Sequence, residues 1–177
     1  MQQFKIIFVG AMGAGKTNAI HSVSDIIPVS TEVPNLDTSA HAKMLTTVGI
    51  DYGMIRLDSE TELLIYGTPG QERFKFIWPV VQQGALGTIL FVDNSSPDPL
   101  TDMAFYVDYY HKLDPYIRMI VAVTHVDLPG GPSQDQYYDV LAQRKLTWPV
   151  FFMDARKKDD VMLLLDTLLA MVEADLD

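Results

Sequence analysis

Residues 10–17 read Gly-Ala-Met-Gly-Ala-Gly-Lys-Thr and follow the apolar run Phe-Lys-Ile-Ile-Phe-Val of residues 4–9. They fill every fixed position of the phosphate-binding pattern G-x-x-x-x-G-K-[ST], and an apolar strand before the loop is the context that this pattern requires. In such a loop the backbone N–H groups surround phosphate oxygens, and the following helix adds its positive end. The stretch therefore predicts a nucleoside triphosphate site. The alternative is a glycine-rich turn between strand and helix that binds nothing.

The residues of this phosphate loop have distinct expected roles. Lys16 would contact the β- and γ-phosphates, and the hydroxyl of Thr17 would be a ligand for the Mg²⁺ that bridges them. The nucleotide-binding residues expected here are Gly10, Ala11, Met12, Gly13, Ala14, Gly15, Lys16, Thr17 and Asn18.

Apolar strand-like runs alternate with helix-like patterns along the chain. Strands are expected at 5–9, 48–57, 62–66, 88–93, 119–124 and 150–153, and helices at 16–27, 100–111, 134–143 and 159–172. Such alternation is typical of an α/β fold in which helices cover both faces of a sheet.

The neighbouring runs 48–57 and 62–66 are separated by Asp-Ser-Glu-Thr and are interpreted as a hairpin. The expected architecture is a three-layer P-loop NTPase fold with a six-stranded, mostly parallel sheet and one antiparallel edge strand, in a single domain over residues 1–177. Residues 28–46 show little periodicity and are expected to form a long loop of functional importance.

Composition limits the class of protein. The chain has 177 residues, 48% apolar content and a net charge of −10. This acidic balance argues against a nucleic-acid surface or attachment to an anionic membrane by charge. The absence of cysteine excludes disulfides, zinc-thiolate sites and prenyl or palmitoyl groups attached to sulfur. With no leader pattern at the first residues and no long apolar stretch, we expect a cytoplasmic protein without a direct membrane anchor.

Two further motifs resemble the switches of Ras-like small GTPases. Residues 67–74, Gly-Thr-Pro-Gly-Gln-Glu-Arg-Phe, resemble the second switch, Asp-Thr-Ala-Gly-Gln-Glu-Arg-Phe; residues 47–52, Thr-Val-Gly-Ile-Asp-Tyr, resemble the Rab first switch, Thr-Ile-Gly-Val-Asp-Phe. Their order and spacing agree with that family as well. The resemblance implies a small G-protein domain that binds GTP or GDP with Mg²⁺, hydrolyses GTP, and presents loops 28–47 and 67–76 to a protein partner.

The resemblance also assigns roles in the switches. Thr47 would place its hydroxyl on Mg²⁺ and its N–H near the γ-phosphate, and Gly70 would offer a backbone N–H to the same phosphate. Gln71 would orient the attacking water. The alternatives are that Thr47 merely begins a strand, with Thr46 in the switch position, and that Gln71 is a solvated loop residue.

The guanine-reading motifs are weaker. Residues 124–127, Thr-His-Val-Asp, stand where the family has Asn/Thr-Lys-x-Asp, so Thr124, His125 and Asp127 are expected at the base. The carboxylate of Asp127 can accept hydrogen bonds from guanine N1–H and the 2-amino group; the alternative is a turn aspartate before Leu-Pro-Gly-Gly. His125 replaces the usual lysine and could stack on the base. Residues 152–156 resemble the last guanine motif, Ser-Ala-Lys, through Ala155, which Arg156 follows.

Gly67 is the clearest departure, because Ras, Rab and Arf proteins carry an aspartate there that holds a magnesium-bound water. A bacterial branch that includes the MglA polarity GTPases and the GTPases encoded beside Roadblock-type proteins commonly lacks this aspartate and has Thr-Pro-Gly-Gln. The chain resembles that branch, which implies a Roadblock-type partner acting as activator or scaffold.

No arginine lies between residues 17 and 55, so the first switch supplies no arginine finger, and Arg56 and Arg73 are the candidates that are left. Met12 would crowd an incoming arginine. We therefore expect slow hydrolysis assisted by a partner.

Two other functions are compatible with the sequence. Gly67, Met12 and His125 together suggest a nucleotide-binding scaffold that hardly hydrolyses GTP. The phosphate loop also resembles that of small-molecule kinases, but such kinases need clustered arginines to hold an anionic acceptor, and the five arginines here are scattered.

Overall fold

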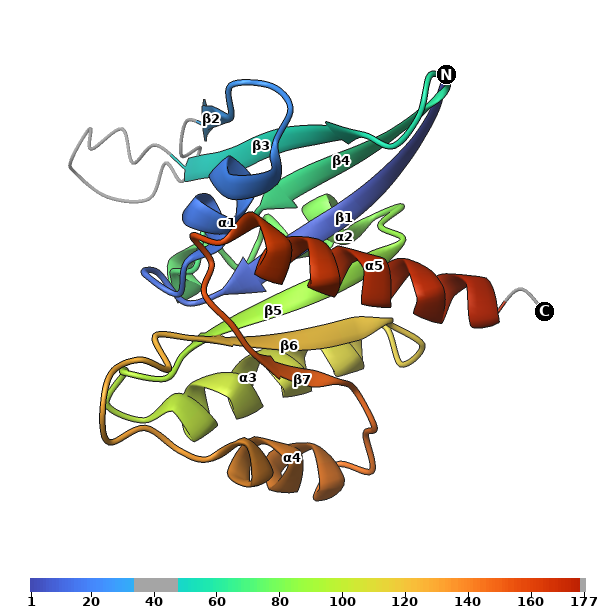
Figure 1. The fold of residues 1–177 in the computed structure, drawn as a ribbon. Helices are drawn as coiled ribbons and strands as arrows, with labels where there is room; N and C mark the ends of the chain where they lie inside the picture. Colours follow the sequence, from blue (N-terminus) through green and yellow to red (C-terminus); the bar gives the residue numbers. More distant parts are fainter. Residues whose placement is uncertain (34–47, 176–177) are drawn as a thin grey trace, which may run out of the picture.

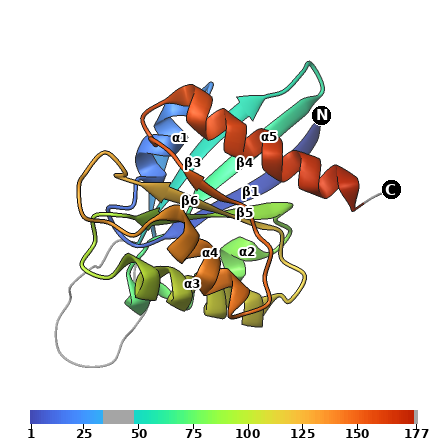
Figure 2. The same cartoon turned by 60° about the horizontal axis from the view of Figure 1, so that its bottom comes forward.

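The computed structural model describes residues 1–33 and 48–175, which form a mixed sheet between two layers of helices (Figure 1, Figure 2). Its strands are β1 (Gln2–Gly10), β2 (Val29–Val33), β3 (Val48–Arg56), β4 (Thr61–Gly67), β5 (Gly87–Asp93), β6 (Met119–Thr124) and β7 (Val150–Phe152). Its helices are α1 (Lys16–Val23), α2 (Trp78–Gln82), α3 (Pro99–Leu113), α4 (Gln134–Ala142) and α5 (Lys158–Ala174), with a 3₁₀ turn η1 (Glu72–Phe74).

The strand order is β2-β3-β4-β1-β5-β6-β7, and β3 runs antiparallel to both of its neighbours. The predicted α/β class is confirmed, but the prediction of six strands with the antiparallel strand at the edge is wrong. Residues 29–33, assigned to the long loop, form β2, which pairs with β3 from Val29 opposite Tyr52 to Val33 opposite Val48. This pairing gives hydrogen-bond partners to a short segment whose sequence shows no clear alternation, and it places β3 inside the sheet.

Two apolar layers enclose the sheet because alternate side chains of each strand point to opposite faces. On β1, Ile6 and Phe8 belong to the cluster that packs under α1 and α5, whereas Ile7 and Val9 belong to the cluster under α2, α3 and α4. Both sets are fully buried. Burial on both faces explains why the central strands are nearly continuous apolar runs in the sequence.

Local side chains fix where the helices begin and end. Asp98 caps α3 by accepting a hydrogen bond from the Thr101 N–H (3.1 Å), and Ser133 and Gln136 form a capping box at α4. Helix α1 ends at Val23 and not near Ile27, because Ser24 has an extended backbone and its hydroxyl donates to the Ile26 carbonyl (2.8 Å).

The carboxyl ends of the parallel strands β1, β4, β5, β6 and β7 meet at one end of the sheet, which we call the loop pole. Ligands of open α/β sheets bind at that end. Among the described residues, no helix combines the length and the apolar character needed to span a membrane.

Candidate nucleotide-binding site

The phosphate loop connects β1 to α1 at the loop pole. Gly13 and Gly15 have φ of +83° and +100°, a left-handed backbone that side chains disfavour. Gly15 is the N-cap of α1 and offers no side-chain cap. The N–H groups of the first helical turn are therefore available to an anion.

The Lys16 ammonium lies inside the phosphate loop. Its Nζ donates hydrogen bonds to the carbonyls of Gly10 and Ala11, both at 2.7 Å, and the residue is buried. Burial lowers the pKa of Lys16 to about 8, and the nearby Asp51 carboxylate opposes this shift. An ammonium group has a further N–H to donate, so Lys16 can bind a phosphate oxygen while it keeps both contacts to the loop.

Asp51 joins this site from β3, although sequence analysis gave it no role. The Thr17 hydroxyl donates a hydrogen bond to Asp51 Oδ2. Asp51 is also the cross-strand partner of Gly67, and a Cβ on Gly67 would lie 3.3 Å from Asp51 Cβ and 3.6 Å from Asp51 Oδ2. The Asp51 carboxylate thus lies where an acidic side chain at position 67 would reach. The signal that could have identified it is the hairpin register, which places position 51 opposite position 67.

Thr17 and Asp51 supply hard oxygen atoms, which suit Mg²⁺. Across residues 1–33 and 48–175, no group of three or more His, Asp or Glu side chains could hold a metal ion. Mg²⁺ is usually held by one or two protein oxygens together with substrate phosphates and water. Thr47, the other expected magnesium ligand, lies outside the described residues, as does most of loop 28–47.

The second switch begins where β4 ends and packs on the phosphate loop. The Thr68 N–H donates to the Phe8 carbonyl (2.9 Å). A Cβ on Gly70 would overlap Met12 N and lie 2.5 Å from Gly10 O, so only glycine permits this approach. Gln71 Nε2 lies 3.4 Å from the sulfur of Met12. The structure therefore brings Gly70 and Gln71 to the loop that would hold the phosphates.

A cavity of about 580 Å³ opens beside the phosphate loop. Its size falls within the range of small-molecule sites. The predicted residues that it brings together are Gly15, Asn18, Thr124, His125, Asp127, Ala155 and Arg156. These residues come from the phosphate loop and the first turn of α1, from the end of β6 and the loop after it, and from the segment between β7 and α5. Three distant parts of the sequence therefore meet in one cavity.

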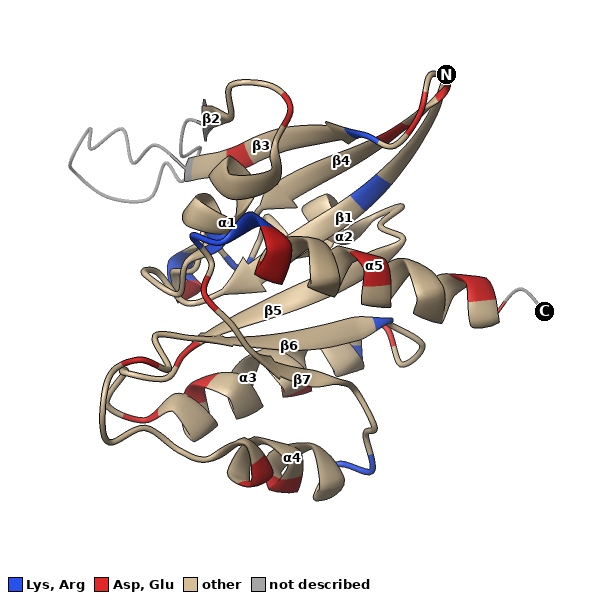
Figure 3. Ribbon diagram, in the orientation of Figure 1, with Lys and Arg blue, Asp and Glu red and all other residues tan. Residues whose placement is uncertain are grey.

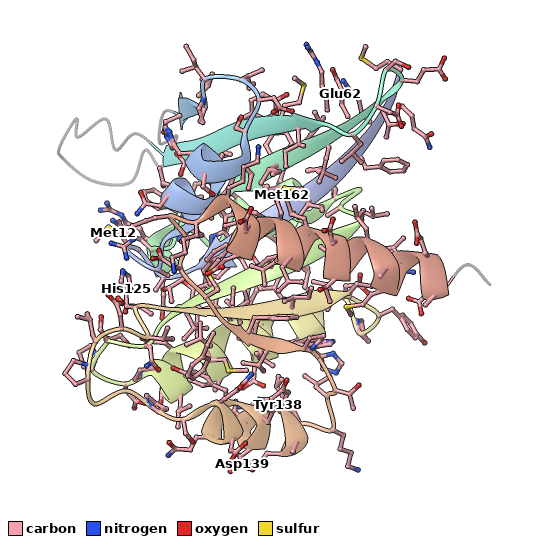
Figure 4. All side chains as sticks on the ribbon, in the orientation of Figure 1. Met12, Glu62, His125, Tyr138, Asp139 and Met162 are labelled. Atoms are coloured by element: carbon pink, nitrogen blue, oxygen red, sulfur yellow. The ribbon has the colours of Figure 1, made fainter. Side chains whose placement is uncertain are left out.

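Thr124 connects the wall of the cavity to the phosphate loop through a hydrogen bond. Its buried hydroxyl donates to the Ala14 carbonyl (2.9 Å) and lies 3.2 Å from the Val92 carbonyl. The neighbouring His125 has a positive φ of 56°, and its Nδ1 lies 2.8 Å from Asp93 Oδ1. Met12 and His125 are on the same side of the molecule (Figure 4).

Asp93 orients the imidazole of His125. Partial burial alone would raise the pKa of Asp93, but hydrogen bonds from Ser95 and the neighbouring His125 hold it below its usual range. The carboxylate stays ionised and keeps the ring of His125 turned toward β5.

The arginines are engaged in other contacts. The Arg156 Nε and Nη2 donate to the two carboxylate oxygens of Asp154, both at 2.8 Å, and these bonds hold the pKa of Asp154 well below its usual range. Figure 3 shows this basic segment beside the acidic first turn of α5. Arg73 lies over the ring of Phe74 at 4.8 Å.

The suggestion that Arg56 serves the site is wrong. Arg56 lies 3.8 Å from Glu62, whose partner on β1 is Gln3, near the start of that strand. Glu62 is found at the end of the sheet opposite Met12 and His125 (Figure 4). The direction of β3 therefore carries Arg56 away from the loop pole.

Curated proteins similar to the chain carry the names of Ras-related Rab proteins. Rab-18 of Caenorhabditis elegans is 29% identical over 133 residues, which are 71% of this chain and 59% of that protein. Rab-8A of Gallus gallus is 33% identical over 93 residues (51% and 39%), and Rab-1D of Dictyostelium discoideum is 32% identical over 103 residues (56% and 45%). The chain thus spans less than two thirds of each of these relatives. No protein-family model matches the chain.

The sheet order, the phosphate loop at the end of β1 and the second switch at the end of β4 agree with these similarities. The chain therefore has the fold of the P-loop small GTPases and is similar in sequence to the Ras-related Rab proteins.

Proposed function

We propose that the chain is a GTP-binding switch that hydrolyses GTP slowly to GDP and phosphate. The observation that carries the proposal is the continuity of the site: Gly15 and Asn18 line the same cavity as Asp127, so a base in the cavity leads directly to phosphates on the loop. Asp127 would accept hydrogen bonds from guanine N1–H and the 2-amino group, where adenine offers an acceptor at N1.

Magnesium fits the same arrangement. Thr17 and Asp51 would hold the ion together with the phosphates, and Thr47 is the further ligand expected from the first switch. When bound, Mg²⁺ neutralises the phosphate charge that develops during hydrolysis. The chain's own contribution is to fix these oxygen atoms beside Lys16.

Hydrolysis would depend on Gln71, which must leave the sulfur of Met12 to orient a water molecule at the γ-phosphate. An arginine that stabilises the transition state has to come from elsewhere. Arg56 lies at the far end of the sheet, Arg118 pairs with Asp175, Arg144 with Asp108 and Arg156 with Asp154, while Arg73 lies on Phe74. This supports slow hydrolysis that a partner accelerates.

The partner that we propose is an activating or scaffold protein of Roadblock type, which would read loops 28–47 and 67–76 and belong to a bacterial system of the MglA kind. The support is the sequence of residues 67–71, in which glycine replaces the family's aspartate and Thr-Pro-Gly-Gln follows.

A second candidate is a scaffold that holds nucleotide without turning it over. It is favoured by Met12, a residue that is 73% exposed and whose sulfur already contacts Gln71 at the place that an incoming arginine would need. Single-turnover hydrolysis, measured with and without a partner, separates the two functions.

Mass spectrometry of the nucleotide that copurifies with the protein tests the proposal, followed by competition among GTP, GDP and ATP for the purified chain. We expect guanine nucleotide in the preparation and displacement by GTP and GDP only. Equal displacement by ATP would refute the assignment of Asp127 as the base reader.

A further inference from the structure

We infer that Trp78 of α2 and Tyr106 of α3 are positioning residues that set the backbone of residues 69–71 for the terminal phosphate of the nucleotide. The inference deepens the proposed function and rests on it.

Two side chains donate to two successive carbonyls in the second switch. Trp78 Nε1 donates to the Pro69 carbonyl (2.9 Å), and the Tyr106 hydroxyl donates to the Gly70 carbonyl (2.8 Å). In a planar trans peptide the C=O and the following N–H point in opposite directions. The first bond therefore fixes the direction of the Gly70 N–H, and the second fixes that of the Gln71 N–H.

Both donors are held rigidly in an aromatic cluster formed by Trp78, Phe105, Tyr106, Tyr109 and Tyr110. The Trp78 ring is fully buried, and its centroid lies 5.3 Å from that of Tyr106 and 5.1 Å from that of Tyr109. Burial, with smaller effects from Asp102 and Glu72, raises the pKa of Tyr106, so its hydroxyl stays protonated and can donate.

The phosphate loop closes the other side of the segment. Gly70 packs on the backbone of Gly10, Ala11 and Met12, so residues 69–71 lie between the aromatic cluster and the loop. By the resemblance to Ras-like switches, Gly70 and Gln71 would contact the γ-phosphate and the attacking water, and no other part of the nucleotide. Donors that are already oriented need no reorganisation during the reaction, and such preorganisation contributes strongly to catalysis.

The test is Tyr106→Phe, which removes the hydroxyl and keeps the ring in the aromatic cluster. We expect single-turnover GTP hydrolysis to slow by about 2- to 12-fold, the equivalent of one neutral hydrogen bond, while GDP affinity stays unchanged. Tyr137→Phe is the matched control, because its buried hydroxyl makes a bond of similar length (2.7 Å) to Asn94, away from the switch. This variant should lose similar stability but keep the wild-type hydrolysis rate.

A second readout is the indole N–H resonance of Trp78, with Trp148, the only other tryptophan, as reference. We expect a hydrogen-bonded Trp78 signal in complexes with both GDP and a non-hydrolysable GTP analogue. Loss of that signal with the analogue, wild-type hydrolysis in Tyr106→Phe, equal loss of GDP and GTP affinity, or a gain in GTP affinity would each overturn the inference. Failure of wild-type protein to bind either guanine nucleotide would instead refute the proposed function, and the inference would fall with it.

Discussion

The Asp51 carboxylate accepts a hydrogen bond from Thr17 at a point that a side chain on Gly67 would also reach. Position 67 thus carries a glycine where the Ras, Rab and Arf pattern has an acid, and Asp51, which matches the aspartate of the Rab first switch, lies opposite it in the β-hairpin. A carboxylate can serve the same oxygen site from either strand, because what matters for Mg²⁺ is the position of the oxygen atom.

The facing positions of residues 51 and 67 predict the outcome of swapping the two residues. Asp51→Gly should weaken Mg²⁺-dependent GTP binding by about tenfold to more than a hundredfold, the cost of a lost bond to a charged group. The double variant Asp51→Gly/Gly67→Asp has the same composition as the wild type and should recover most of the affinity. Isothermal titration with and without Mg²⁺ measures both effects. Wild-type affinity in the single variant would show that the carboxylate is not used.

A second residue-scale prediction concerns the base. Asp127→Asn should shift the preference from guanine to xanthine nucleotides, because the amide N–H can donate to the carbonyl at C2 of xanthine. Competition binding with GTP and xanthosine triphosphate checks this, with Asp135→Asn, an acidic residue on α4 that does not line the cavity, as the control. An unchanged preference would show that residue 127 does not contact the base.

Some of the site could be predicted at this scale and some could not. The phosphate loop was predictable because all its residues are contiguous and their spacing is fixed by backbone geometry. The pairs Thr17–Asp51 and Asp93–His125 are separated by 34 and 32 positions. They depend on strand register and on the left-handed backbone of His125, which local pattern does not specify.

At the scale of elements, β5 and α5 approach closely because Gly87 has no side chain. A Cβ at this position would lie 2.6 Å from Leu168 Cδ1 in the core beneath α5. The contact is between a central strand and the longest helix, so strain there would act on the packing of the whole layer.

We expect Gly87→Ala to lower the free energy of unfolding by about 1–3 kcal/mol through overpacking. Leu168→Ala alone should cost about 2–5 kcal/mol. The double variant should cost less than the sum, since each change relieves the other. Urea denaturation of the four proteins measures the interaction. Strict additivity would mean that the two sites do not share the same space.

The sequence predicted elements well where the apolar pattern was strong. It predicted them poorly where a segment becomes a strand only because it pairs with a neighbouring strand. Strand β6 has the predicted bounds, 119–124, because six buried apolar or small residues form an unbroken run. Strand β2 was missed because its structure depends on pairing with β3, and η1 and α2 were missed because each is no more than five residues long.

For the molecule as a whole, the described residues supply only part of the groups that the proposed hydrolysis needs. Gln71 is at the phosphate loop, but every arginine of the chain is paired, stacked or at the far end of the sheet. A partner that supplies an arginine would approach a chain with a net charge of −10. A partner with a basic contact surface would associate faster with such a chain at low salt.

We therefore predict unassisted turnover near the low end of the range of about 10⁻⁴ to 10⁻² s⁻¹, with acceleration of about 10³- to 10⁵-fold by a supplied arginine. Gln71→Leu should keep GTP affinity and abolish the acceleration. Phosphate release from purified protein is the measurement. Turnover near 1 s⁻¹ without a partner, or a Gln71→Leu variant as fast as the wild type, would mean that another group activates the water.

The direction of β1 and α5 has a practical consequence. Strand β1 runs from Gln2 to the phosphate loop, and α5 starts beside the cavity, where Lys157 and Asp160 line it, and ends at Ala174, about 25 Å further along its axis. The start of β1 and the end of α5 are drawn on the side away from the phosphate loop (Figure 1). A protein captured on a sensor chip through a tag at either end would hold its loop pole outward, so nucleotide and partner would reach it from solution.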